Sequence, residues 1–363
     1  MDSNAPVLIG AETLENLVRD IFVANGCDAA EGYRISHHLL GANLAGHDSH
    51  GVARVPRYVE WQQSGYVVAG QQAEVVMDGG AFALLDGKWG FGQTVAEQAT
   101  DFGIERAKQH GVAVVALKNA GHIGRTGAYT EQALAHGLIA IHFVNVAGSV
   151  LVAPFGGTER RFSTAPIAIG VPTNPPVVLD FATSLVAEGK VLVASNGGKP
   201  LPPDALIEPD GRLSGDPHTL YGEYERVGPR SSEKGAGAIR AFGEHKGSGL
   251  AFMCELLAGA FTGGGTSGPV EKRGRIANGM LSIYISPSHF GTQAEFIRAA
   301  ENYVAWVKSC RPAEAGGEVL APGEPEARRR ADRLANGVPL QPDTWESIVQ
   351  TARKLGVTVP NRA

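Results

Sequence analysis

The sequence predicts an α/β protein in which a layer of helices packs beside a sheet core. Two continuous apolar segments, 112–117 and 138–144, have the length of strands buried on both faces. A helix-length segment separates them, and strand–helix–strand alternation is typical of α/β folds. Amphipathic segments lie near both ends of the chain. The 48 glycines among 363 residues indicate many tight turns.

The N-terminal segment predicts three helices. Apolar residues recur at helical spacing over 14–22, and Gly26 follows as a helix-ending residue. Asp28 and Glu31 have the spacing of a capping box, which would open a second helix. A third helical segment covers 52–65.

The middle of the chain alternates short apolar segments with helical ones. Asp-Gly pairs follow the first two predicted strands and favour turns there. The predicted strands are 74–78, 83–86, 112–117, 138–144, 166–173, 177–181 and 278–285. The predicted helices are 93–110 and 128–136, each closed by a glycine, and a helix through Phe261.

The remaining segments complete the outline. Residues 197–237, rich in Gly, Pro and Ser, predict a long surface excursion. An amphipathic helix covers 296–307, and the basic run 328–330 reads as a solvated helix face. A last helix, 344–354, would return to the helical layer. The domains expected are an N-terminal helical layer at 1–75, a core of one or two subdomains at 76–310, and a C-terminal segment at 311–363.

Composition excludes several classes of protein. Hydrophobic residues make up 43% and charged residues 19%, which argues against disorder. The net charge of −5 gives no basic field for nucleic acid or an anionic membrane. Three dispersed cysteines indicate reduced thiols. No targeting signal or long apolar run is present, so we expect a cytoplasmic protein with neither nucleic acid nor membrane as a partner.

The strongest candidate site is the stretch Gly46-His47-Asp48-Ser49-His50-Gly51-Val52-Ala53-Arg54. An unperturbed imidazole titrates at about 6.5, so His50 can transfer a proton near neutral pH. The planar fork of Arg54 matches a carboxylate. Together they suggest a small organic acid as substrate. The alternative is structural, with Asp48 and Ser49 forming a turn and His50 a polar helix end.

Three further segments carry candidate ligand contacts. His122 and Arg125 lie in a loop after a predicted strand, where α/β proteins bind ligands, although a plain polar turn would look the same. Asp180 ends an apolar strand and could hold ribose hydroxyls, orient a histidine, or cap a helix. His245 and Lys246 precede an apolar helix and suit an anion, unless the nearby glycines serve only helix packing.

Spacing alone does not indicate a nucleotide. No GxGxxG follows a predicted strand, and no GxxxxGK[ST] occurs. A rival from another class is a metal-dependent hydrolase that uses His47, Asp48, His50 and His122. His-x-x-His is not a recognised zinc spacing, so we expect no metal.

Five motifs, taken in order, resemble one family. They are Asp48-Ser49-His50-Gly51-Val52-Ala53-Arg54, Gly121-His122-Ile123-Gly124, Leu179-Asp180-Phe181-Ala182-Thr183-Ser184, His245-Lys246-Gly247-Ser248-Gly249 and Pro322-Gly323-Glu324. This order is similar to that of the type-2 malate/L-lactate dehydrogenase family, over about residues 10 to 355. The resemblance implies NAD(P)-linked interconversion of 2-oxo and 2-hydroxy acids, with cyclic imino acids as the alternative substrates. It also implies a non-Rossmann fold with a mixed-sheet cofactor domain, a helical layer from both termini, and a homodimer.

The resemblance also implies roles for single residues. His50 would be the general acid/base, Arg54 the carboxylate clamp and His122 a second imidazole at the reacting carbonyl, with Asp180 completing the catalytic set. Ser49, Arg54 and His122 would contact substrate. The implied NAD or NADP contacts are His50, Gly124, Arg125, Thr126, Asp180, Phe181, Ala182, Thr183, Ser184, His245, Lys246, Asn278, Ala321, Pro322, Gly323 and Glu324. Where relatives usually carry Gly-Thr-Asn-Pro, this chain has Ser163-Thr164-Ala165-Pro166. Ala165 replaces the asparagine, so contacts that its side-chain amide makes in relatives are not expected here.

Overall fold

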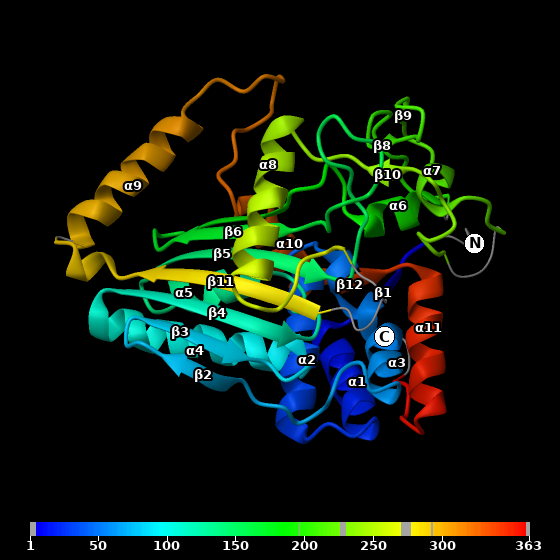
Figure 1. Cartoon of the computed structure of the whole chain (residues 1–363), viewed down its shortest axis with the longest axis horizontal. Coiled ribbons are helices and arrows are strands. Elements are labelled where there is room, and N and C mark those ends of the chain that lie inside the picture. The colour runs from blue at the N-terminus through cyan, green and yellow to red at the C-terminus, as the bar shows by residue number, and fades with distance from the viewer. Residues whose placement is uncertain (1–4, 196, 226–229, 270–276, 292, 361–363) are drawn as a thin grey trace.

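The computed structural model describes residues 5–195, 197–225, 230–269, 277–291 and 293–360. A seven-stranded mixed sheet forms the centre of the molecule, and a group of helices lies beside it (Figure 1). The strand order is β2-β3-β4-β11-β5-β6-β7. The strands are β2 (Glu74–Asp78), β3 (Phe82–Asp86), β4 (Val112–Ala120), β5 (Ile139–Ala147), β6 (Pro166–Val171), β7 (Val177–Ala182) and β11 (Ala277–Ile285).

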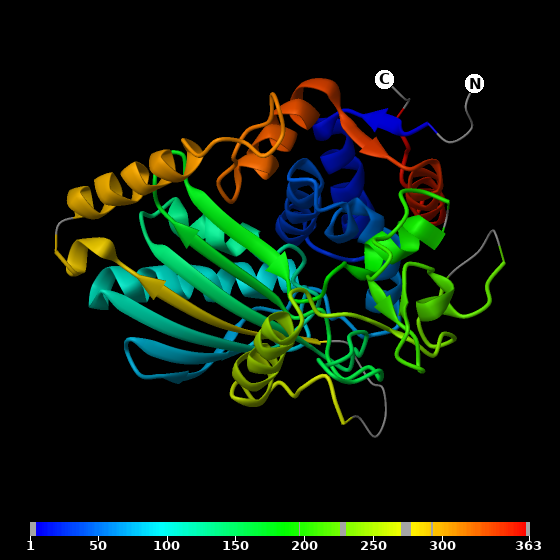
Figure 2. The ribbon, with the colours of Figure 1, turned by 90° about the horizontal axis from the view of Figure 1, so that it is seen from above.

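The centre of this sheet is built from segments that are distant in sequence. β4 and β5 run in the same direction but do not pair, because β11 lies between them and is antiparallel to both. Among the described strands of this sheet, only β3 and β4 pair in parallel. The apolar character predicted for 112–117 and 138–144 thus reflects central positions in the sheet. α4 (Gly92–His110) and α5 (Gly127–Leu134) cover one face. α8 (His245–Cys254) and its continuation η3 (Glu255–Ala260) lie on the other face (Figure 2).

The helical layer draws on both ends of the chain, as the family resemblance implies. It contains α1 (Ala11–Ala24), α2 (Ala29–Leu44), α3 (Val55–Gln63) and α11 (Pro342–Lys354), and β1 (Val7–Ile9) pairs with β12 (Val338–Leu340). Side chains from both ends share one core, including Phe22, Leu39, Tyr58 and Ile348. α10 (Glu324–Asn336) contacts α2.

The predicted capping box at the start of α2 is half correct. Asp28 accepts a hydrogen bond from the backbone N–H of Glu31 at 2.7 Å, so it is the N-cap. The Glu31 carboxylate does not return to Asp28. It is buried and accepts instead from the backbone N–H of Gly70 at 2.7 Å and from Thr94 at 3.4 Å. Contacts with residues distant in sequence therefore replace the hydrogen bond that Glu31 would accept from the Asp28 backbone N–H in a capping box.

The described residues between 197 and 237 form more regular structure than a surface excursion would have. They contain β8 (Leu206–Ile207), β9 (Leu213–Ser214) and α7 (His218–Tyr221), which follow α6 (Glu188–Ser195). β8 and β9 form a three-stranded sheet with β10 (Ala238–Ile239). Leu206, Leu220 and Ile239 are fully buried in a separate core cluster. The Gly- and Pro-rich composition reflects tight turns in a compact unit.

The predicted amphipathic helix near residue 300 is present as α9 (Gln293–Lys308). None of its side chains is buried within the described chain, and Trp306 remains 70% exposed. Figure 1 shows α9 at the edge of the molecule, apart from the helical layer. In the described residues, no helix is both long and apolar enough to cross a membrane.

His142, on the central strand β5, makes folding sensitive to acid. It is fully buried, with Nδ1 2.8 Å from the Ser282 hydroxyl, and burial lowers its pKa to about 3. Below about pH 6.5 the unfolded chain binds a proton at this residue that the folded chain does not. We therefore expect His142 to remove about 2 kcal/mol of unfolding free energy between pH 7 and pH 5.

Denaturant titrations of wild type and His142→Asn at both pH values would test this prediction. The variant should lose less stability on acidification, whereas a matched change at the exposed His110 should leave the pH dependence unchanged. Equal pH dependence in wild type and His142→Asn would contradict the prediction.

Candidate active site

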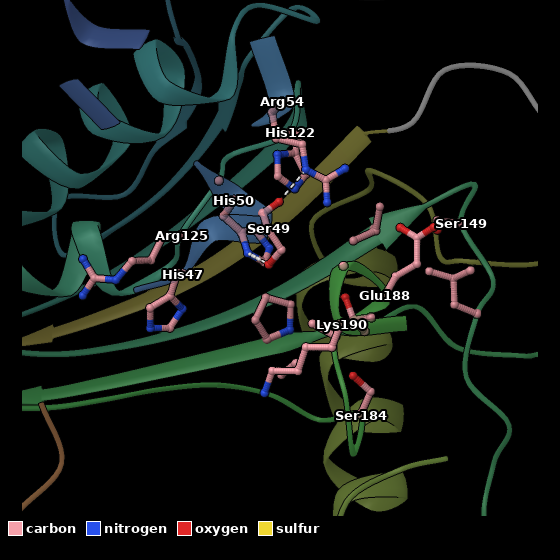
Figure 3. A pocket seen from close by; sticks show the side chains of 18 of the residues that line it. His47, Ser49, His50, Arg54, His122, Arg125, Ser149, Ser184, Glu188 and Lys190 are labelled. Atoms are coloured by element: carbon pink, nitrogen blue, oxygen red, sulfur yellow. Dashed lines mark hydrogen bonds between the residues drawn. The ribbon is translucent and has the colours of Figure 1, made fainter. Parts of the chain in front are cut away.

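A cavity of about 890 Å³ lies where the helical layer meets the sheet. Its walls come from the stretch 46–54, the loop after β4, the segment 148–151, the end of β7 and the start of α6. Figure 3 shows its polar side chains, which include the predicted residues His50, Arg54, His122 and Arg125. The structure thus brings together side chains that lie up to about 280 residues apart, since Asp180, Glu326 and Arg329 also line the cavity.

The stretch 46–54 is held by side chains outside the cavity. The Asn43 side chain accepts from the Val52 backbone N–H at 2.8 Å and donates to Asp48 at 2.7 Å. Arg333 of α10 binds the Asp48 carboxylate at 2.6 Å. A Cβ on Gly51 would lie 2.1 Å from the Asn43 side chain, so only glycine fits there. Residues 48–50 do form a turn, as the structural alternative proposed, but the turn directs His50 into the cavity wall.

Two imidazoles stack within the cavity wall. The His50 and His122 ring centroids are 5.6 Å apart, with ring planes at 13°. His50 Nδ1 lies 3.1 Å from the Ser49 hydroxyl, and His122 Nδ1 lies 2.5 Å from the Tyr58 hydroxyl. Each histidine therefore has one ring nitrogen engaged.

The pKa values of both imidazoles are lowered, which favours their neutral forms at pH 7. Burial and the Arg54 charge lower the pKa of His50 to about 3. The same two causes hold the pKa of His122 well below its usual range. The expectation that His50 titrates near neutral pH is therefore wrong in this structure, because desolvation and a neighbouring cation both disfavour the imidazolium.

Arg54 presents its guanidinium to the cavity. Its Nε donates to the Ser49 carbonyl oxygen at 2.6 Å, which fixes the side chain. Neither terminal nitrogen has a protein acceptor among the described residues. In Figure 3 the guanidinium lies beside His122, facing Glu188 across the cavity. An unpaired planar fork of this kind suits a carboxylate.

Arg125 is neutralised by protein carboxylates. Its side chain is 2% exposed and makes two hydrogen bonds to Glu131, at 2.5 and 3.1 Å. Its Nε lies 3.4 Å from Asp180, which accepts from the Gly127 backbone N–H at 2.9 Å. Burial raises the pKa of Asp180, and Arg125 opposes that shift. Asp180 lies within β7 and does not cap a helix, because α6 begins only at Glu188.

Two side-chain hydroxyls in the cavity wall lack hydrogen-bond partners among the described residues. The hydroxyls of Thr126 and Ser184 are buried and have no partner among the described residues. Buried polar groups are normally hydrogen-bonded, so unpaired ones in a cavity wall indicate a polar ligand. Of the predicted cofactor contacts, His50, Gly124, Arg125, Thr126, Asp180, Phe181, Ala182 and Ser184 line this cavity.

A second cavity of about 810 Å³ contains the C-terminal motif. Ala321, Pro322, Gly323 and Glu324 line it. Arg125 and Asp180 line both cavities, so this ion pair lies at their boundary. A ligand long enough to occupy both cavities would contact the pair.

Four predicted cofactor residues lie outside both cavity walls. Thr183 is buried and donates to the Thr164 carbonyl at 3.1 Å. Asn278 is buried and accepts from the Ile123 backbone N–H at 2.9 Å, so it supports the His122 loop. His245 and Lys246 are exposed at the start of α8. Their contact with a cofactor stays a prediction.

Sequence reasoning missed several residues of the site. The sequence predicted 52–65 and 93–110 only as helical segments, yet Tyr58 and Gln93 within them both contact His122. Glu188 and Lys190 also line the cavity. Gly189 lies between them and packs closely against the stretch 46–54, because a Cβ there would lie 2.5 Å from the Ser49 side chain. The four residues of the hydrolase alternative all line this cavity, but no group of three or more side chains in the described chain is arranged so that it could hold a metal ion.

Comparison with known proteins defines the class. The model of the family described as malate/L-lactate dehydrogenase matches residues 9–349. The chain therefore belongs to the malate/L-lactate dehydrogenase family, as its motif order predicts. It is similar to hydroxycarboxylate dehydrogenase B of Escherichia coli strain K12, with 39% identity over 352 residues, 96% of this chain and 94% of that relative. This similarity agrees with a resemblance to that relative in the phrases Ala42-Asn43-Leu44-Ala45-Gly46-His47-Asp48-Ser49-His50, Ile141-His142-Phe143-Val144 and Val152-Ala153-Pro154-Phe155-Gly156-Gly157.

Solved structures share the fold. The malate dehydrogenase of Pyrococcus horikoshii OT3 superimposes with a TM-score of 0.86 at 27% identity, covering 99% of this chain and 98% of that one. The delta1-piperideine-2-carboxylate reductase of Pseudomonas syringae pvar. tomato gives a TM-score of 0.80 at 29% identity, covering 95% and 99%. These likenesses confirm the mixed α/β fold.

Proposed function

We propose that this protein is an NAD(P)-dependent oxidoreductase that interconverts 2-oxo acids and 2-hydroxy acids. The observation that carries the proposal is the grouping of two imidazoles and an unpaired guanidinium on one cavity wall. A carboxylate clamp beside proton-transferring groups suits an acid with a carbonyl or hydroxyl at the adjacent carbon. The names of the relatives, which include malate dehydrogenase and hydroxycarboxylate dehydrogenase B, support it.

The unpaired polar atoms fit a nicotinamide dinucleotide. Thr126 and Ser184 would hold it in the first cavity, and 321–324 in the second, with Asp180 at the boundary. The bound cofactor would supply or accept the hydride at C2 of the substrate. NAD and NADP both stay open.

The substrate would bind through its carboxylate to the two free nitrogens of Arg54. This pairing would hold C2 in one orientation, with its oxygen toward His50 and His122. During reduction an imidazole would stabilise the negative charge that develops on this oxygen and then donate a proton to it. During oxidation the neutral imidazole would take the proton from the hydroxyl.

The lowered pKa values of His50 and His122 are consistent with substrate binding before proton transfer. Arg54 is one cause of the lowered pKa of both histidines. A bound substrate carboxylate would offset the Arg54 charge and thereby raise the proton affinity of the imidazoles. The acid form would then be populated where substrate is present to use it.

A reductase of cyclic imino acids is the second candidate. The structural relative from Pseudomonas syringae carries such an activity in its name. A cyclic imine 2-carboxylate presents the same carboxylate beside a C=N bond, so Arg54 and the imidazoles could serve both substrates.

Following NADH and NADPH absorbance against a panel of 2-oxo acids and cyclic imine carboxylates would test the proposal. We expect oxidation of at least one reduced cofactor with a 2-oxo acid. The matched 2-oxo amides, which lack the charge that Arg54 would bind, should react far more slowly. Preference for the imines would select the second candidate. Cofactor binding without turnover across the panel, or equal turnover of acids and amides, would contradict the proposed function.

We also propose that the protein is a homodimer. The exposed apolar side chains Tyr303 and Trp306 lie on α9, and Phe252, Met253 and Leu256 lie on α8 and η3. Apolar patches of this kind often mark protein interfaces. Analytical ultracentrifugation should give twice the chain mass of 38.0 kDa, and a monomer at micromolar concentration would contradict the dimer.

A further inference from the structure

A buried hydrogen-bond network lies on the side of His122 away from the cavity. The Tyr58 hydroxyl is 2.5 Å from His122 Nδ1. Gln93 Nε2 lies 3.2 Å from the same hydroxyl and 3.1 Å from the His122 carbonyl oxygen. Tyr58 is 2% exposed and Gln93 is fully buried. These two residues approach the histidine from the helical layer and from α4, respectively.

The direction of each hydrogen bond follows from its partners. A carbonyl oxygen can only accept, so the side of the Gln93 amide that faces the His122 carbonyl must be its NH₂ group. The same NH₂ group donates to the Tyr58 oxygen. The Tyr58 proton is therefore available for His122 Nδ1. Its other acceptor, the His122 carbonyl, is at 3.4 Å and much less favourable.

We propose that Tyr58 and Gln93 are positioning residues that hold neutral His122 in its Nε2–H tautomer. A neutral imidazole that accepts at Nδ1 carries its proton on Nε2. Nε2 has no partner among the described residues, and the ring lines the cavity. The site therefore presents a preformed N–H donor to the substrate oxygen. This inference rests on the proposed function for its catalytic consequence, but the tautomer itself does not.

The surroundings keep the network rigid. The Tyr58 ring stacks on Trp61 at 5.7 Å and packs near Phe22 and Phe91. A Cβ on Gly92 would lie 2.5 Å from the carbonyl oxygens of Gly121 and His122, so α4 can begin here only with glycine. The phenol and the amide consequently have little freedom to exchange their roles.

His50 has a different arrangement. Its Nδ1 faces a serine hydroxyl, which can donate or accept with similar ease, so the neighbours do not select its tautomer. The charged and titratable groups facing His122 are Arg54 from the turn 52–54, His50 from the turn 48–50, and Tyr58 from α3. The two stacked imidazoles thus have different roles, one a fixed donor and the other free to change its protonation.

Long-range ¹H–¹⁵N correlation spectra of protein labelled with ¹⁵N-histidine would test the proposal directly. The spectrum assigns the tautomer of each of the 11 histidines without any turnover, and the signals lost in His122→Asn identify His122. We expect Nε2–H in the wild type and a mixture of tautomers in Tyr58→Phe, which keeps the ring but removes the hydroxyl. Gln93→Glu should favour the Nδ1–H tautomer, because its carboxylate accepts the Tyr58 proton.

Kinetics provide a second readout. In Tyr58→Phe we expect kcat for oxo acid reduction to fall about 10- to 100-fold, with KM for the acid little changed because Arg54 is intact. The pH profile of kcat should also shift. Tyr284→Phe is the matched control, since it removes another buried tyrosine hydroxyl beside a histidine, His142, outside the cavity.

The outcomes separate this inference from the proposed function. Nδ1–H in the wild type, or an unchanged tautomer in both Tyr58→Phe and Gln93→Glu, would overturn the positioning role whatever the enzyme does. If the spectra show the expected tautomers but the enzyme turns over neither oxo acids nor imines, the positioning role of Tyr58 and Gln93 would stand and the proposed function would be rejected. An equal effect of Tyr284→Phe on kcat would show that the loss is structural and would contradict the proposal.

Discussion

Replacing His50 with alanine is expected to lower kcat for the 2-oxo acid about 10²- to 10⁴-fold while leaving NADH binding nearly unchanged. General acid–base catalysis is typically worth this factor, and alanine removes the ring nitrogen that would exchange the proton. Of the predicted cofactor contacts, Thr126 and Ser184 remain in place, so the dinucleotide should still bind. Steady-state turnover together with NADH fluorescence titration would measure both effects.

His37→Ala is a suitable control for this experiment, because His37 is exposed on α2 and lies outside both cavity walls. Near-wild-type turnover in His50→Ala would reject His50 as the acid/base. If His122→Asn were inactive in that case, proton transfer would be assigned to His122 alone. Loss of NADH binding in His50→Ala would instead indicate that His50 is chiefly a cofactor contact.

Replacing Arg54 with leucine is expected to lower kcat/KM for the oxo acid roughly 30- to 5000-fold. This corresponds to a loss of about 2–5 kcal/mol of transition-state stabilisation. The loss should appear largely in KM, since the guanidinium would bind the carboxylate in both ground and transition states. Arg54→Lys should fall between wild type and Arg54→Leu, because an ammonium keeps the charge but not the planar fork. Arg19→Leu, on the outer helix α1, is the control.

The same variant has a predicted effect on proton affinity. Arg54 lowers the pKa of both His50 and His122, so its removal should raise both values. The pH profile of the residual activity in Arg54→Leu should therefore shift to higher pH. An unchanged KM and an unchanged profile would together contradict the role of Arg54 as the clamp.

Much of the architecture could be predicted because it depends on local patterns. The apolar spacing of 14–22 predicted α1, and Gly26, with φ of +106°, follows its end. Gly111 ends α4 in the left-handed conformation, as its place after the helical segment indicated. The position of β11 between β4 and β5 could not be read from periodicity, because pairing between strands about 130 to 170 residues apart leaves no local trace.

The candidate site divides in the same way. His50, Arg54 and His122 stood out as chemically capable residues in glycine-containing segments, and the cavity contains all three. Tyr58 did not stand out, because an aromatic residue at a helical position is indistinguishable from a core residue until its hydroxyl is seen against a histidine. Arg125 was predicted as a ligand contact from its place in a loop, but the sequence did not show that Glu131 and Asp180 pair with it in the folded chain.

The sequence alone determined most of the longer helices, the strands of the seven-stranded sheet, the helix-ending glycines and the family, and it singled out the candidate site residues, since these follow from residue type, short-range spacing and motif order. The tertiary structure decided which groups are paired and which face a ligand. It also lowered the pKa of His50, which was expected to titrate near neutrality, to about 3, and it holds the pKa of His122 well below its usual range. Burial and the neighbouring guanidinium set that proton affinity, and both arise only when the helical layer closes against the sheet.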